Sequence, residues 1–314
     1  MEQNIVHDRI SELPEVLRQH ILSFLSTKQV VQSTLLNRCC VYCWILFVFE
    51  SDVQELDLDF GFCGYLQYFP LPQPVLIAKS LTVLTLRSLK LDSTSVKGDF
   101  DINLPSLKQL SLTLVYTDDQ IIQNLLAGCP VIEYINFESC HGFKSIKLAE
   151  NAKLMTFRVN NNNCCMTLEL AASNLSCLSI FQNLQSELSL LPFKNLKELN
   201  LHSSEETDKQ KLSCHHLKTL ELSYKCKMAE VKIDAPKLCR FSFCYLGGYI
   251  KSFSLNALAL SYAFYGLLPL LDSYNLLNDE NIELLSKLNN TQLLKLLIPS
   301  IKVLLAIVLS LNDL

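Results

Sequence analysis

Cysteine and histidine are the residue types in this chain that could bind a metal or act as nucleophiles. Cys40 and Cys43 have the Cys-x-x-Cys spacing of zinc and redox sites, and Cys214-His215-His216 offers further ligands. A structural zinc site needs a second ligand pair at a fixed spacing, and none follows Cys43. We therefore expect no metal site and no redox function, and we interpret His215-His216 as part of a solvated turn.

Catalytic motifs are not found in the sequence. None of the six histidines has an acid, base or nucleophile at a spacing typical of a catalytic site. Gly61-x-x-Gly64 is an isolated turn sequence and not a phosphate-binding loop. We expect no catalytic residues and no cofactor, so the chain should act by binding and not as an enzyme.

Composition and charge limit the partners. The 314 residues are 49% hydrophobic and 18% charged, and their formal net charge is −4 with no long run of either sign. Nucleic-acid binding needs a basic stripe, so we expect no nucleic-acid partner. Met1–Ile10 has no apolar core of a signal peptide, so the thirteen cysteines should stay reduced in the cytoplasm and/or the nucleus.

One segment has the length of a membrane span. Ser252–Leu271 contains no charged residue over twenty positions, and about twenty apolar residues are enough to cross a bilayer as a helix. The segment continues an alternating apolar pattern from upstream and contains Asn256 and Pro269. This pattern favours strands, and we expect no membrane partner.

The elements that would position a binding site begin with helices. Asp8–Phe49 has apolar residues at three- and four-residue steps, which places them on one helical face. Pro14 suits a first helical turn, where its missing N–H costs nothing. About fifty residues with such an apolar face are marginally stable alone, so this all-α segment requires a partner.

The rest of the chain is repetitive. From about residue 53 the pattern is Leu-x-x-Leu-x-Leu, and five leucines each follow the previous one after 21 residues: Leu154, Leu175, Leu196, Leu217 and Leu238. Each of the five begins a unit that continues with an alternating apolar pair, such as Leu199-x-Leu201. This periodicity predicts a leucine-rich-repeat solenoid, because repeats of about 20–29 residues are typical of that fold.

Two kinds of coil are expected. After about residue 140 a second alternating pair follows half a repeat later, at Leu168–Leu170, Leu188–Leu190, Val231–Ile233 and Phe253–Leu255. This spacing is too short for a helix with its turns, so these coils should be two-stranded.

Ser203–Lys211 is rich in charge and should form a solvated loop. Asp118–Pro130 is predicted as a capped helix, which makes the earlier coils mixed α/β and the whole chain α+β.

Strand alternation also predicts a candidate binding surface. The residue between the last two leucines of each Leu-x-x-Leu-x-Leu unit should point outward, and stacked coils align these residues on the concave face. A neighbouring outward column holds Asn160, Phe181, His202 and Ser223, in which the aromatic Phe181 among polar residues resembles an interface anchor. The candidate residues for binding a target protein are Arg158, Asn160, Ser179, Phe181, Asn200, His202 and Glu221.

Two parts of the sequence resemble one plant family. Asp8-Arg9-Ile10-Ser11-x-Leu13-Pro14-x-x-x-Leu17 and the segment 21–28 resemble the F-box of plant F-box/leucine-rich-repeat proteins, and Trp44 matches the tryptophan that closes the motif. Segments 118–133 and 233–238 resemble that family's repeats. Cys39-Cys40 replaces the family's usual basic residue and tryptophan, and Ser26 replaces its usual proline.

The resemblance implies a function by binding. An F-box docks onto a Skp-type adaptor and through it a cullin, so the chain would be the substrate-recognition subunit of an SCF-type ubiquitin ligase whose repeats bind an unknown target protein. The alternative is a leucine-rich-repeat scaffold with a degenerate F-box that no longer binds the adaptor. The resemblance places the adaptor contact on Leu13, Pro14, Leu17, Ile21, Leu22 and Leu25.

The sequence predicts three segments. These are an F-box at residues 1–50, a solenoid at 51–275, and a C-terminal helix with an apolar tail at 276–314 that caps the solenoid. The helix is expected at Asn278–Leu288, and Val303–Leu311 should be a final strand or helix. We expect the chain to lack the further C-terminal domain of many family members.

Overall fold

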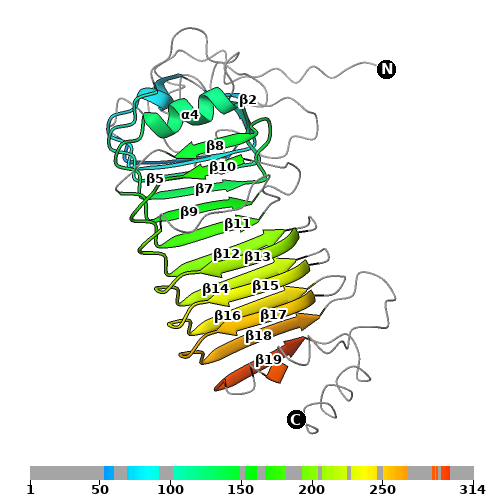
Figure 1. Ribbon diagram of the computed structural model, residues 1–314. Helices are drawn as coiled ribbons and strands as arrows, with labels where there is room; N and C mark the ends of the chain where they lie inside the picture. Colours follow the sequence, from blue (N-terminus) through cyan, green and yellow to red (C-terminus); the bar gives the residue numbers. More distant parts are fainter. Residues whose placement is uncertain are drawn as a thin grey trace, which may run out of the picture. The chain divides into compact units, whose positions relative to one another are not determined.

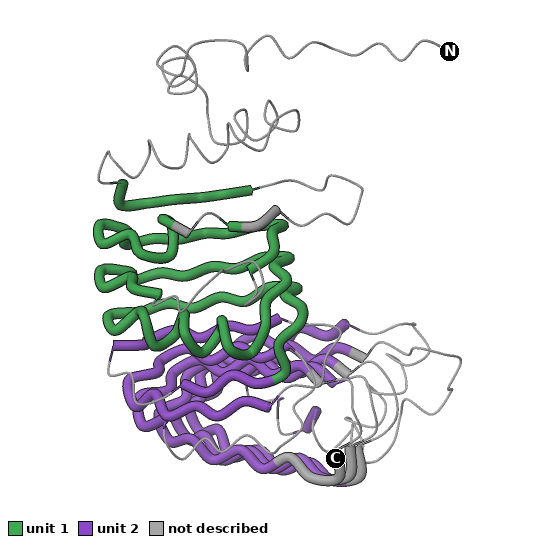
Figure 2. The backbone as a smooth tube through the Cα atoms, turned by 90° about the horizontal axis from the view of Figure 1, so that it is seen from above, with its two compact units in different colours: residues 1–144 green, residues 145–314 purple. Residues whose placement is uncertain are grey.

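A computed structural model describes most of the repeat region. The described residues are 53–59, 69–71, 73–91, 102–148, 153–160, 167–181, 193–203, 207–224, 228–245, 250–267, 285–286, 288 and 291–297. The predicted F-box and the tail segment 303–311 lie outside them. The chain divides into two compact units, Met1–Lys144 and Ser145–Leu314, coloured separately in Figure 2.

Unit 1 is built on a parallel sheet. Its strands follow each other in the order β1 (Glu55–Asp59), β3 (Val83–Arg87), β5 (Gln109–Thr113) and β7 (Tyr134–Glu138) (Figure 1). The leucines of the Leu-x-Leu pairs point into the core, where Leu84 and Leu86 are fully buried. The alternation of apolar and polar residues therefore becomes an alternation of inward and outward side chains, as predicted.

The other side of unit 1 combines short strands and helical turns. Its elements are β2 (Phe69–Pro70), β4 (Leu89–Leu91), β6 (Tyr116–Thr117), the 3-10 helix η1 (Gln73–Ile77) and α4 (Asp119–Ala127). The helix predicted at Asp118–Pro130 is confirmed: the Asp118 side chain caps it by accepting the Ile121 N–H at 2.8 Å. The three short strands, which pair in parallel, were not predicted.

Unit 2 repeats a simpler coil. Its long parallel sheet has the strand order β9 (Thr156–Asn160), β11 (Cys177–Phe181), β12 (Glu198–Ser203), β14 (Thr219–Tyr224), β16 (Arg240–Tyr245), β18 (Tyr262–Leu267) and β19 (Leu293–Leu297). The second strands of the coils form two smaller parallel sheets. One contains β8 (Ser145–Leu148) and β10 (Thr167–Leu170), and the other contains β13 (Thr207–Ser213), β15 (Met228–Asp234) and β17 (Ile250–Asn256).

The two-stranded coils after residue 140 are confirmed where the structure describes them. Segments 168–170, 231–233 and 253–255 all lie in strands, β10, β15 and β17, whereas Leu188–Leu190 is outside the described residues. The loop predicted at Ser203–Lys211 is wrong, because Thr207–Lys211 belongs to β13. Parallel pairing with β15 satisfies this backbone and outweighs the low strand propensity of its charged residues.

The leucines spaced by 21 residues form the inner corner of each coil. All five are at most 1% exposed. The N–H groups of the last four close the same tight turn, from Leu175, which donates to the Ala172 carbonyl at 3.2 Å, to Leu238, which donates to the Ala235 carbonyl at 2.9 Å. An identical turn and strand in each coil explain why the sequence period is constant here.

The apolar segment 252–271 contributes to strands β17 and β18 over its described part. Within the described ranges, no helix has the length and apolar character needed to span a membrane. At the predicted C-terminal helix, Leu285, Ser286 and Leu288 are helical, and the leucines are buried.

Candidate protein-binding surface

The outward residues of the unit 2 sheet form one aligned row across its strands. Arg158 pairs in register with Ser179, Ser179 with Asn200, and Asn200 with Glu221. The row continues on the next three strands. We call these seven residues the central column: Arg158, Ser179, Asn200, Glu221, Ser242, Phe264 and Lys295.

On β9 and β14, burial alternates sharply between the column residue and its chain neighbours. Phe157 and Val159 are fully buried, and Arg158 between them is exposed. Leu220 and Leu222 are likewise buried on either side of exposed Glu221. The side chains of the column therefore point to the opposite side of the sheet from the hydrophobic core.

One member of the central column, on β11, is nearly inaccessible. Ser179 is only 5% exposed, so this predicted contact residue offers little surface to a partner. Arg158 interacts with the thiol of Cys177, which burial keeps protonated by raising its pKa while Arg158 acts to lower it. Glu198 also acts on this thiol.

A second row lies beside the central column. We call Asn160, Phe181, His202 and Ser223 the outer column, and they pair in register on β9, β11, β12 and β14. The rings of Phe181 and His202 stack with centroids 6.0 Å apart and an interplanar angle of 23°. Both residues are half-buried, so the pair presents a flat aromatic patch between the polar residues Asn160 and Ser223 of the same column.

The structure brings the seven predicted target-binding residues together on one face of one sheet. Phe264 and Lys295 of the central column are not predicted from the sequence period. Ser242 and Phe264 are register partners 22 residues apart, and Phe264 and Lys295 are 31 apart, so the 21-residue period no longer locates them. The sequence signal that could have located Phe264 is the alternation of inward and outward residues in the strand Tyr262–Leu267.

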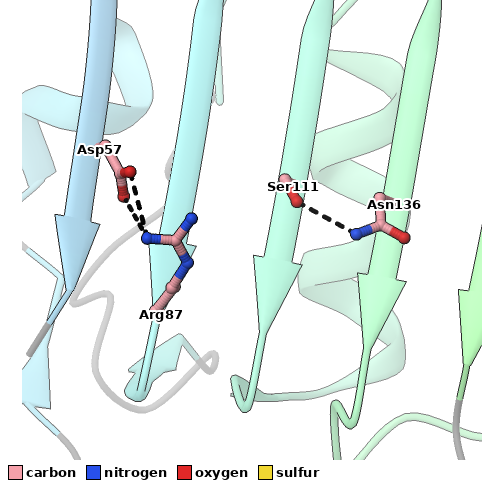
Figure 3. Close-up of polar contacts among 4 residues, drawn as sticks. All are labelled: Asp57, Arg87, Ser111 and Asn136. Atoms are coloured by element: carbon pink, nitrogen blue, oxygen red, sulfur yellow. Dashed lines mark hydrogen bonds and ion pairs between the residues drawn. The ribbon is translucent and has the colours of Figure 1, made fainter. Parts of the chain in front are cut away.

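Unit 1 has the corresponding row Asp57, Thr85, Ser111 and Asn136. Here polar side chains contact each other (Figure 3). Arg87 Nη1 donates to both carboxylate oxygens of Asp57 at 3.1 Å, and Asn136 Nδ2 donates to Ser111 Oγ at 3.2 Å. Three of the four residues of the row, Asp57, Ser111 and Asn136, thus have a side-chain partner within the unit itself.

Thiols and histidines outside these rows have structural surroundings. Cys140 is buried, and the carbonyls of Leu112 and Glu138, at 3.4 and 3.5 Å from its Sγ, are the acceptors within reach of its single S–H. His215 and His216 are exposed in a turn. Among the described residues, no group of three or more His, Cys, Asp and Glu side chains is arranged to hold a metal ion. The Cys40/Cys43 pair and the predicted adaptor contacts at residues 13–25 lie outside that region.

Comparison with known proteins places this architecture in a family. Residues 41–211, more than half of the chain, match the family model for the leucine-rich repeats of FBD-associated F-box protein At5g56370. Two Arabidopsis thaliana F-box/LRR-repeat proteins are similar: At3g18150 is 26% identical over 62% of this chain and 52% of its own length, and At3g03360 is 22% identical over 85% and 68%.

A third relative, F-box/LRR-repeat protein 25 of Arabidopsis thaliana, is 22% identical over 50% of this chain and 78% of its own length. The match to At3g18150 thus spans about half of that relative. The repeat pattern, the parallel solenoid sheet and these similarities agree. The chain belongs to the plant F-box/leucine-rich-repeat family.

Proposed function

We propose that this chain is the substrate-recognition subunit of a cullin-based, SCF-type ubiquitin ligase. Its F-box, residues 1–50, docks onto a Skp-type adaptor, and its repeats bind a target protein in the cytoplasm and/or the nucleus. Family membership supports the first contact. The observation that supports the second is the central column, in which seven strands each present one outward residue at the same register.

Such a subunit accelerates ubiquitin transfer without chemistry of its own. Holding the target near the ligase raises the effective concentration of its lysines, and proximity alone lowers the barrier substantially. The chain then needs two separate surfaces and no catalytic group. The adaptor surface and the target surface are placed on different segments of the sequence, so each can be altered without altering the other.

The geometry of the sheet suits a protein partner better than a small molecule. Adjacent strands are about 4.8 Å apart, so the central column extends over several neighbouring strands as an open face. A stable protein interface buries about 800 Å² on each partner. A continuous sheet face provides such an area, and the Phe181–His202 stack provides an aromatic centre of the kind that dominates binding energy.

The proposal is tested by co-purification of the full chain with a Skp-type adaptor. We expect wild type to recover the adaptor and the double variant Leu13→Ala, Pro14→Ala to lose most of it. Leu258→Ala is the matched control, because Leu258 is 86% exposed in a turn of unit 2 and is not part of the F-box. A wild-type chain that recovers no adaptor would instead support the scaffold without a functional F-box.

A further inference from the structure

The turns that lead into β12, β14 and β16 stack on one side of unit 2 (Figure 1). Each turn buries one corner leucine, Leu196, Leu217 or Leu238, and its polar residues stand around that leucine. The positions two before, one before and one after the leucine include no Asp or Glu in these three coils. We call the basic residues at these positions the corner ridge, and all six are exposed: Lys194, Lys197, His215, His216, Lys218 and Lys237.

Backbone hydrogen bonds hold the ridge in register from coil to coil. The Lys218 N–H donates to the Lys197 carbonyl at 2.8 Å, and the Cys239 N–H donates to the Lys218 carbonyl at 2.9 Å. Lys197 and Lys218 are therefore one coil step of about 4.8 Å apart. Two positions before the corner, the preceding coil has Ser173 and the following coil has Leu258, so the ridge is confined to three coils.

The fold does not require this concentration of positive charge. The ridge side chains are exposed, so they do not contribute to the core. No salt bridge between described residues includes a ridge side chain. Like charges at neighbouring positions of adjacent strands are unfavourable. A partner with negative charge would offset this repulsion, because it supplies the opposite charges that the ridge lacks.

Acids on both sides of the ridge limit the class of partner. Glu198 is the first residue of β12 and directly follows Lys197, and Asp234 is the last residue of β15. A nucleic-acid strand carries a phosphate about every 3.4 Å and would pass close to these carboxylates. A protein segment with acids separated by uncharged residues has a lower charge density and can contact the lysines alone. The flanking acids therefore favour a protein segment.

Building on the proposed function, we propose that the target protein binds the corner ridge with an acidic segment, in which several Asp or Glu residues are separated by uncharged residues. The ammonium groups of Lys197 and Lys218 donate to its carboxylates, and charge-assisted hydrogen bonds of this kind are among the strongest. The ridge lies at the beginning of the strands that present Asn200 and Glu221, so one target can contact both the ridge and the central column.

Fluorescence anisotropy of the full chain with a labelled dodecapeptide of alternating Ser and Glu tests the proposal. Three chains are compared: wild type, the double variant Lys197→Glu, Lys218→Glu, and the matched control Lys79→Glu, Lys108→Glu, which makes the same charge change at exposed lysines of unit 1. We expect the ridge variant to bind the peptide about tenfold or more weakly, and the control to bind within about twofold of wild type. Lys197→Arg with Lys218→Arg should keep the affinity, because the charge remains.

Three results would overturn the proposal. Equal weakening by the ridge variant and the control would mean that the peptide senses only net charge. Equal binding of a Ser and Gln dodecapeptide would mean that the acids are not recognised. Tighter binding of a single-stranded oligothymidylate than of the acidic peptide would make the ridge a nucleic-acid surface.

Folding and adaptor docking are checked separately. Circular dichroism should show the same spectrum for all variants, and Lys194→Glu with Lys237→Glu gives a second ridge variant that should also weaken peptide binding. The adaptor co-purification depends on residues outside the ridge, so a failure of ridge binding and a failure of adaptor docking are distinguishable results.

Discussion

The guanidinium of Arg87 on β3 reaches across to Asp57 on β1 and donates to both of its carboxylate oxygens at 3.1 Å. The pair lies on the outward face of unit 1, one strand apart and two residues out of register. It shows how this face of unit 1 pairs its own charges between neighbouring strands.

We expect this ion pair to contribute little to stability. The two side chains are 41% and 58% exposed, and exposed pairs contribute at most about 1 kcal/mol. Arg87→Ala should therefore lower the free energy of unfolding by no more than about 1 kcal/mol, measured by denaturant titration. A loss of several kcal/mol would mean that Arg87 has a packing role beyond the pair.

The inward leucines of unit 2 should be far more sensitive. Leu199 and Leu220 are fully buried in neighbouring coils, and a buried Leu→Ala change costs about 2–5 kcal/mol because it leaves a cavity. Either substitution should cause a loss of that size in chemical denaturation. Leu258→Ala is the control, since its side chain is 86% exposed and should be nearly neutral. Equal effects at all three positions would contradict the assignment of the core.

Buried thiols should be inert in the folded chain. Burial raises the pKa of Cys140 to about 11 and that of Cys129 to about 12, from the ordinary value of 9.0. Both should resist alkylation by iodoacetamide at pH 8 until the chain is unfolded, whereas half-exposed Cys239 should react, as mapped by mass spectrometry. Rapid labelling of Cys140 under native conditions would show that unit 1 opens at this coil.

The same shift predicts a loss of stability in alkali. Below pH 9 the Cys140 thiol is protonated in both the folded and the unfolded chain, so it adds no pH dependence. Above pH 9 the unfolded thiol ionises first, and the free energy of unfolding should fall until about pH 11, where the folded thiol also ionises. The loss is about 3 kcal/mol in total. Cys140→Ala should remove this part of the pH dependence.

Much of the fold could be predicted from the sequence because one apolar pattern repeats. The constant interval from Leu154 to Leu238 located the turns and the strands β9, β11, β12, β14 and β16 of unit 2. The charged strand β13 could not be predicted this way, because its pairing with β15 supplies the stabilisation that its own residues lack. The short strands β4 and β6 were missed for a related reason: two or three residues are too few to show a period.

The candidate surface could be predicted as far as the period extends. Alternation alone placed Arg158 and Glu221 on the outward face, and the strand register agrees. Alternation could not predict that Ser179 would be nearly inaccessible to solvent, because the size of the neighbouring side chains decides how much of it is exposed. Nor could it find Lys295, which enters the column after a much longer coil than the others.

The most direct test of the proposed function compares the proteins that the full chain recovers from plant cells when the adaptor surface and the target surface are altered separately. We predict that Arg158→Ala with Phe181→Ala lowers recovery of a defined set of proteins about tenfold or more and leaves the Skp-type adaptor unchanged. Leu13→Ala with Pro14→Ala should do the reverse. If both double variants recover the same proteins as wild type, or if the face variant also loses the adaptor while remaining folded, the chain does not join a target to the ligase through two separate surfaces.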